Sequence, residues 1–184
     1  VSSTLLVAAV EPQAAYRAGD FPTAEKAWRA TVAKQPTDWI ARHNLSLALA
    51  QQERAGEAAG QASAAFVQNP AAPAARWHFA LAAEKSGFAP SALAGFLTPG
   101  PAQTLARLAS PAQWQHALIL AAVLAALALG WILKNAYGRK SRLAYFGAPA
   151  LFTLSVALAV GVVNGLLTFG IATRENDVVV ANAG

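Results

Sequence analysis

Two long uncharged stretches constrain the fold of this chain more than any other feature. Residues 110–133 and 143–173 contain no Lys, Arg, Asp or Glu. Each is long enough to provide the roughly 20 apolar residues that a helix needs to cross the hydrocarbon core of a bilayer. Charged residues make up only 12% of the 184 residues, about half the share usual in a soluble domain. We therefore predict a transmembrane hairpin formed by helices over 112–133 and 147–172.

The segment between the two predicted spans is short and basic, and it predicts their orientation. It covers residues 134–146 and carries four cations with no acid: Lys134, Arg139, Lys140 and Arg142. Basic loops remain in the cytoplasm, so the regions on either side of the hairpin are expected on the opposite face. In a bacterial inner membrane that face is the periplasm. Trp114 and Trp131 bracket the first span, as aromatic side chains at the two membrane interfaces would.

Small residues spaced four apart occur in both predicted spans. The second contains Gly161 and Gly165 with the amide of Asn164 between them, and the first contains the pairs Ala121/Ala125 and Ala122/Ala126. Small residues let two helix backbones approach closely, and an amide in hydrocarbon requires a hydrogen-bonding partner. Two interpretations remain open: these faces pack the two spans against each other, or they dock a separate membrane subunit.

A sequence repeat occupies the region before the hairpin. Residues 19–28 read GDFPTAEKAW and residues 87–96 read GFAPSALAGF. The matched positions are Gly19/Gly87, Pro22/Pro90, Thr23/Ser91, Ala24/Ala92 and Trp28/Phe96. Ala58 lies halfway between Ala24 and Ala92, and Pro36 and Pro70 are also 34 residues apart. A 34-residue period is that of a helix–turn–helix repeat.

On these residues, the region 12–98 resembles the tetratricopeptide repeat (TPR) family. We expect three units, over about 12–37, 38–71 and 72–98, with helix pairs near 12–18 and 22–34, 38–52 and 56–68, and 73–86 and 90–97. Alanines at the repeated level would let the two helices of a unit touch, while Trp28 and Phe96 would fill the space between units. The middle unit has Glu53 where the others have a turn glycine. The predicted fold is all-α: a three-unit TPR-like array followed by a two-helix transmembrane hairpin.

Three further segments complete the predicted organisation. Residues 1–11 are either the end of a processed signal segment or an apolar lead-in that packs on the first helix. Residues 99–111 contain several Pro and Gly and are expected to form a juxtamembrane linker. Residues 173–184 are expected to begin an extracytoplasmic C-terminal segment.

The sequence offers little support for catalysis or for a cofactor. There is no Cys, which excludes thiolate nucleophiles and thiolate metal sites. His43, His78 and His116 are not spaced as metal ligands, and no phosphate-binding Gly-rich loop or nucleophile elbow occurs. The cations do not form a nucleic-acid footprint interleaved with aromatics. We therefore predict no enzyme activity, no catalytic residues, no metal, no cofactor and no nucleic-acid partner.

A partner-binding groove is the remaining candidate site. Arrays of helical repeats bind ligands on a concave face, and in this array the first helix of each unit is expected to line it. The residues that the repeat register places there are Tyr16, Arg17, His43, Asn44, Leu47, Gln51, Trp77, Leu81, Glu84 and Lys85. Aromatic anchors contribute strongly to binding, so Trp77 is either the anchor of a bound partner or a packing residue between units two and three.

The order of these parts is similar to that of the BatE-like TPR membrane proteins of the bacterial aerotolerance (Bat) operon. The stretches AAYRAGDFPTAEKAW, ARHNLSLALA and GIATRENDVVVANAG carry this resemblance. It implies an SH3-like domain that begins after the second span. It also implies a scaffold in a hetero-oligomer with membrane subunits bearing von Willebrand factor A-type domains, associated with a MoxR-type ATPase. Alternatives are a periplasmic assembly chaperone of the cytochrome c maturation type and a cell-wall-sensing anchor.

Overall fold

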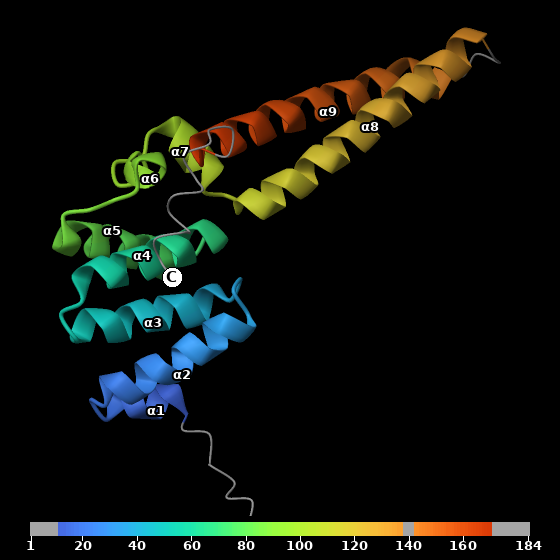
Figure 1. Ribbon diagram of the computed structural model, residues 1–184. Coiled ribbons are helices and arrows are strands. Elements are labelled where there is room, and N and C mark those ends of the chain that lie inside the picture. The colour runs from blue at the N-terminus through green and yellow to red at the C-terminus, as the bar shows by residue number, and fades with distance from the viewer. Residues whose placement is uncertain (1–10, 138–141, 171–184) are drawn as a thin grey trace, which may run out of the picture. The chain divides into compact units, whose positions relative to one another are not determined.

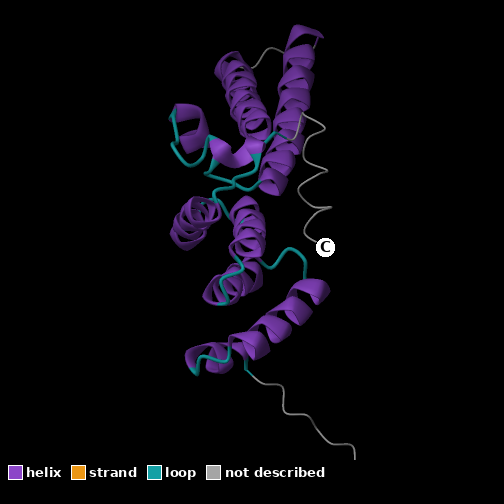
Figure 2. Ribbon diagram, turned by 60° about the vertical axis from the view of Figure 1, so that its left-hand side comes forward, coloured by secondary structure: helices purple, strands orange, loops and turns teal. Residues whose placement is uncertain are grey.

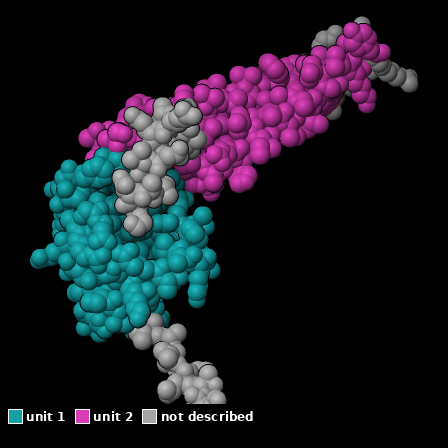
Figure 3. All heavy atoms as spheres, viewed as in Figure 1, with its two compact units in different colours: residues 1–90, 181–184 teal, residues 91–180 magenta. Residues whose placement is uncertain are grey.

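The computed structural model describes residues 11–137 and 142–170, and every regular element among them is a helix (Figure 2). The all-α prediction is therefore confirmed for these residues. The helices, labelled in Figure 1, are α1 Pro12–Arg17, α2 Phe21–Lys34, α3 Trp39–Gln51, α4 Ala55–Gln68, α5 Pro73–Ser86, α6 Ser91–Ala94, α7 Pro101–Ala106, α8 Pro111–Tyr137 and α9 Arg142–Thr168. They fall into two compact units, described over 11–90 and over 91–137 with 142–170 (Figure 3).

Local sequence signals start the helices of the first unit. Asp20 caps α2 by accepting a hydrogen bond from the Thr23 amide, and Asp38 caps α3 by accepting from the amides of Ile40 and Ala41. Such caps satisfy amides that have no partner within the helix. The α5 helix begins at Pro73, where the missing amide hydrogen of proline costs nothing.

Consecutive helices of the first unit pack against one another, from α1 through α5. Their first core cluster contains Ala24 and Ala58, which are fully buried, together with Trp28, Leu45 and Leu49. The small residues predicted from the 34-residue spacing thus lie at close helix contacts in the first two helix pairs. The stacked rings of Phe66 and Phe79, 4.9 Å apart, continue the packing from α4 to α5.

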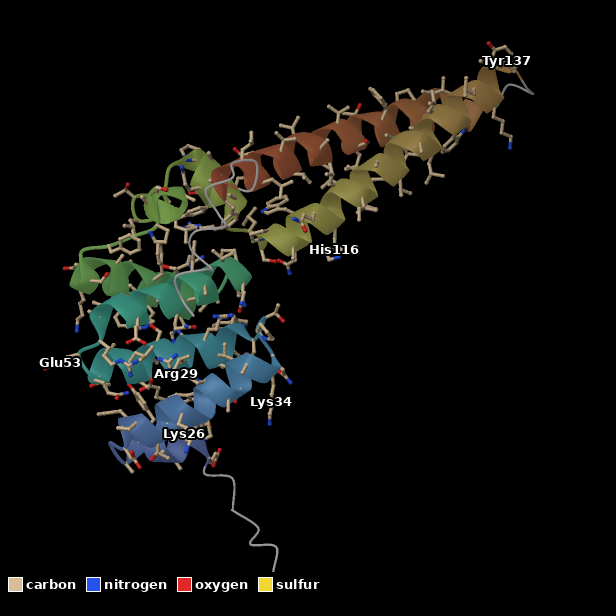
Figure 4. The ribbon with its side chains drawn as sticks, in the orientation of Figure 1. Lys26, Arg29, Lys34, Glu53, His116 and Tyr137 are labelled. Atoms are coloured by element: carbon tan, nitrogen blue, oxygen red, sulfur yellow. The ribbon has the colours of Figure 1, made fainter. Side chains whose placement is uncertain are left out.

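The tight turns of this unit recur at the same interval as the sequence repeat. Gly19, Glu53 and Gly87 all adopt positive φ angles, of 80°, 61° and 66°. Each follows the first helix of a predicted pair. Glu53, labelled in Figure 4, therefore adopts the left-handed conformation that its two glycine counterparts adopt without a Cβ penalty.

Replacing Glu53 with glycine is expected to stabilise the first unit by about 1 kcal/mol, because it removes the left-handed strain of a residue that carries a Cβ. Chemical denaturation of the purified protein in detergent would measure the change. The matched variant Gly87→Ala introduces a Cβ at φ 66° with nothing within 4 Å of it, so only backbone strain should act and the sign should reverse. A loss of stability in Glu53→Gly would contradict the prediction.

The third helix pair differs from the predicted one. The helix expected over 90–97 covers only Ser91–Ala94, and Ala92 is half-buried rather than buried. Phe96 does not fill the gap between repeats as Trp28 does; its ring stacks on Phe169 with centroids 4.8 Å apart, within the second unit. The Gly and Pro residues between 95 and 101 explain the short helix, because both residue types disfavour helix continuation.

An ionic cluster ties α2 to the turn between α3 and α4. The Glu25 carboxylate accepts hydrogen bonds from Arg29 at 2.7 Å, from Arg54 at 2.8 Å and from Gln52 at 2.9 Å. Arg29, labelled on α2 in Figure 4, and Arg54 also pair with Glu57 at 2.8 and 2.6 Å. Burial alone would raise the pKa of Glu25, but these donors outweigh it and the pKa is lowered. Glu25 is therefore held as a carboxylate.

The second unit is built around a hairpin of α8 and α9 (Figure 1). Each helix has 27 residues, about 40 Å at 1.5 Å per residue. Both are long and apolar enough to cross a membrane. Helix α8 extends beyond both ends of the predicted span 112–133, and α9 begins before the predicted span 147–172. Residues 134–137 and 142–146 of the predicted loop are therefore helical. Outside the described residues lie Arg139, Lys140, residues 1–10 of the predicted segment 1–11, and the predicted segment 173–184.

Candidate partner-binding surface

The residues predicted to line a groove divide into three groups. Tyr16 belongs to the core rather than to a free surface: its ring lies 5.3 Å from that of Phe21 and 5.7 Å from that of Trp28. The exposed residues of the set lie on α1, α3 and α5 and are Arg17, Gln51, Trp77, Glu84 and Lys85. Those that are half-buried are His43, Asn44, Leu47 and Leu81.

Trp77 is the most informative of these side chains. It is 66% exposed on α5, so it does not act as a packing residue between helix pairs. Its equivalent on α3, one 34-residue period earlier, is His43, and the next turn brings Leu47 and Leu81 to matching positions. The register therefore gives α3 and α5 a similar line of apolar or aromatic residues, which ends at the polar Gln51 and Lys85.

A buried polar contact joins α3, α4 and α5 beneath this surface. The Ser46 hydroxyl donates to the Ala58 carbonyl at 2.6 Å and lies 2.7 Å from Nε2 of His78. Because the only hydroxyl hydrogen is already used, Nε2–H of His78 must donate to Ser46. The neutral ring therefore leaves Nδ1 of His78 unprotonated, and this atom is buried without a partner, as is Nδ1 of His43.

Burial lowers the tendency of both histidines to take up a proton, and His43 adds to this effect at His78. Their rings lie 5.1 Å apart. Burial, and secondarily the nearby His43, lowers the pKa of His78 to about 4, and burial also lowers the pKa of His43. Both are therefore neutral at physiological pH.

This arrangement does not resemble a catalytic nucleophile and base. A base must accept the hydroxyl proton, whereas His78 donates to Ser46 and the serine hydrogen points to a backbone carbonyl. No group of three or more His, Asp or Glu in the described ranges could hold a metal ion. Ser46 and His78 are best understood as a polar link that holds three helices in register.

In the second unit, the small residues of α9 contact the other helix of the hairpin. A Cβ placed on Gly165 would lie 2.7 Å from the indole atoms of Trp114 on α8, and one on Gly161 would lie 3.9 Å from the same ring. Of the two open interpretations, this geometry favours packing between the two helices. It provides no free Gly161/Gly165 face for a separate subunit.

The other predicted packing residues also act inside this unit. Ala121 is buried, and its carbonyl accepts a hydrogen bond from Ser155 at 2.9 Å; Ala125 is half-buried. The Asn164 amide donates to the Ala102 carbonyl of α7 at 3.1 Å.

Trp114 was predicted as an interfacial aromatic, but it is buried in the hairpin. Its Nε1–H donates to the Ala106 carbonyl of α7 at 2.8 Å. Trp131 lies half-buried against Gly147, where a Cβ would approach its ring to 2.8 Å. Each tryptophan thus faces a glycine of the opposite helix.

Comparison with known proteins adds nothing to this geometry. No family model, curated protein or solved structure matches the chain.

Sequence reasoning missed the Ser46–His78 contact and the pairing of Trp114 with Gly165. Neither has a local signal, because Ser46 and His78 are 32 residues apart and Trp114 and Gly165 lie on different helices. For Trp114 and Gly165 the sequence carries one weak, non-local signal: the first span has a Trp near each end, and the second span has a Gly near each end. The contacts of Glu25 with Gln52 and Arg54 were missed for the same reason, because both partners lie beyond α3, in the following helix pair.

Proposed function

We propose that this chain is a non-enzymatic scaffold subunit, anchored by a two-span hairpin, that uses TPR-like helix pairs to assemble a bacterial inner-membrane complex. The observation that carries the proposal is the exposure of Trp77 on a sequentially packed helical array. Removing an indole from water is favourable, so a partner that covers Trp77 gains binding free energy from it. Such exposed aromatics are typical anchors of protein–protein interfaces.

The class of partner follows from the resemblance to BatE-like proteins and from the surface itself. Trp77, Leu47 and Leu81 offer apolar contact, and Glu84 and Lys85 offer charges of both signs at the edge. This mixture suits a helix or an extended segment of another protein. We assign it to the extracytoplasmic part of another membrane subunit, of the von Willebrand factor A-type class, in a hetero-oligomer.

The proposed topology places the first unit and the C-terminus in the periplasm and the basic segment 134–146 in the cytoplasm. The basic segment containing Lys134, Arg139, Lys140 and Arg142 supports this orientation. Because the chain has no Cys, a membrane-impermeant maleimide should label Gln51→Cys in intact spheroplasts and Lys134→Cys only after lysis. Both positions are exposed in the structure. Labelling in the reverse order would contradict the orientation.

Replacing Trp77 with alanine is expected to reduce recovery of partner subunits about tenfold, the effect of removing a typical interface anchor. The measurement is affinity purification of the tagged full-length chain from membranes solubilised in mild detergent, with the recovered subunits quantified.

Phe88→Ala is the matched control, because Phe88 is similarly exposed, at 60%, but does not lie on α3 or α5. It should leave recovery unchanged. An isolated monomer in mild detergent would contradict the scaffold proposal. Weak, salt-sensitive binding of a changing set of clients would instead favour the chaperone alternative.

A further inference from the structure

The short helix α7 is fixed to one end of the hairpin by two hydrogen bonds. The Asn164 amide of α9 donates to the Ala102 carbonyl, and the Trp114 indole of α8 donates to the Ala106 carbonyl. Ala106 is fully buried as a result. Helix α7 therefore occupies a defined level along the hairpin, beside the C-terminal part of α9 (Figure 1).

Polar residues mark that level as the end of the apolar part of the hairpin. Gln113, Gln115 and His116 are exposed on the first turns of α8, and Asn164 and Thr168 lie on the last turns of α9. Figure 4 labels His116 near the start of α8 and Tyr137 at its far end. At about 40 Å, α8 is longer than the hydrocarbon core of about 30 Å. If the hairpin spans a bilayer, its first turns lie among the lipid headgroups.

At this level α7 presents leucines outward. Leu105 is 40% exposed and Leu108 is 65% exposed. With Pro99, Gly100, Pro101 and Thr104 they line an open, mainly apolar groove. Arg107 lies between the two leucines and is half-buried. Apolar side chains next to a cation match the boundary between acyl chains and phosphates, where the leucines enter the hydrocarbon and the guanidinium stays at the headgroups.

We propose that residues 99–108 form a phospholipid-binding foot, in which Leu105 and Leu108 insert among the acyl chains of the leaflet at the Pro111 end of the hairpin. Leu118, Ile119 and Leu120 of α8 are also exposed near this end of the hairpin, and a hairpin that spans a bilayer places them against lipid. Because α7 is hydrogen-bonded to the same end of the hairpin, lipid is the occupant that its groove meets. The inference rests on the proposed membrane placement of the hairpin, and it adds that α7 fixes the depth of the hairpin in the bilayer.

Lipid quenching of single-cysteine variants tests the foot directly, because the chain contains no Cys. Full-length Leu105→Cys and Leu108→Cys would be labelled with an environment-sensitive fluorophore and reconstituted into phosphatidylcholine vesicles. The quencher would be lipid brominated close to the headgroup. We expect at least threefold stronger quenching at both positions than at Lys26→Cys, an exposed position on α2 labelled in Figure 4.

A third variant separates failure of the foot from failure of the membrane placement. Leu127 is exposed in the middle of α8, so Leu127→Cys should be quenched by lipid brominated deep in the acyl chains. Quenching at 127 with only background quenching at 105 and 108 would overturn the foot alone. Background quenching at all three positions would overturn the membrane placement and the foot together.

Discussion

Replacing Gly165 with leucine is expected to destabilise the α8–α9 hairpin by about 3 kcal/mol. Even the first carbon of the new side chain would lie 2.7 Å from the Trp114 ring, so the indole must move. Overpacking of this kind typically costs about 1–3 kcal/mol. Moving the ring also breaks its hydrogen bond to Ala106, which adds about 1 kcal/mol. Unfolding by SDS in mixed micelles, followed by tryptophan fluorescence, would measure the shift.

Gly130→Leu is the matched control for this substitution. Gly130 also lies inside a helix of the hairpin, but a Cβ there meets nothing within 4 Å. We expect its unfolding midpoint to stay close to that of the wild type. Equal midpoints for Gly165→Leu and Gly130→Leu would show that Gly165 does not form the contact described. Loss of partner subunits without loss of hairpin stability would instead indicate that the Gly161/Gly165 face docks another chain.

Acidification from pH 7.5 to pH 5 is expected to destabilise the first unit by about 2 kcal/mol. Burial and the neighbouring His43 lower the pKa of His78 to about 4 in the folded protein, whereas an unfolded histidine titrates near 6.5. The unfolded chain therefore binds more protons between these values. The stability is fully present above pH 6.5 and falls as the pH drops towards 4.

The pH range of this change distinguishes titration of the two histidines from titration of Glu25 and Glu57 in the ionic cluster. The pKa values of Glu25 and Glu57 are lowered by their arginine and glutamine partners, so their contribution is lost only as the pH falls below the usual glutamate range. Hydrogen exchange of the α3–α5 amides, corrected for the intrinsic rate at each pH, would report on the unit in the full chain. The double variant His43→Gln/His78→Gln cannot titrate in this window and should show a flat profile. An unchanged slope in that variant would contradict the assignment.

Much of the first unit could be predicted from spacing alone. The 34-residue interval placed Ala24 and Ala58 in close helix contacts and predicted helices near the observed bounds of α2 to α5. The spacing failed at the third helix pair. It matched Phe96 to Trp28 because both side chains are large and aromatic, and this similarity does not determine what Phe96 contacts. The ring of Phe96 is instead stacked on Phe169, a contact that no repeat period encodes.

The candidate site was predicted less completely, for a similar reason. Placing a residue on the first helix of a pair does not determine whether neighbouring helices cover it. Tyr16 and Trp77 were assigned to the same face, yet Tyr16 packs on Phe21 and Trp28 whereas Trp77 is 66% exposed. Exposure depends on which side chains arrive from other helices, so it is a property of packing.

The sequence by itself determined that the chain forms helices throughout the described residues, where the turns lie, and that two helices are long and apolar enough for a membrane. These properties follow from local periodicity, capping residues and the absence of charge over a span length. Only the tertiary structure decided that Gly165 receives the Trp114 ring, that His78 is buried against Ser46 and that Trp77 is free of the core. The physical reason is that local preferences act between residues close in the chain, whereas burial and close packing depend on side chains that only the folded backbone brings together.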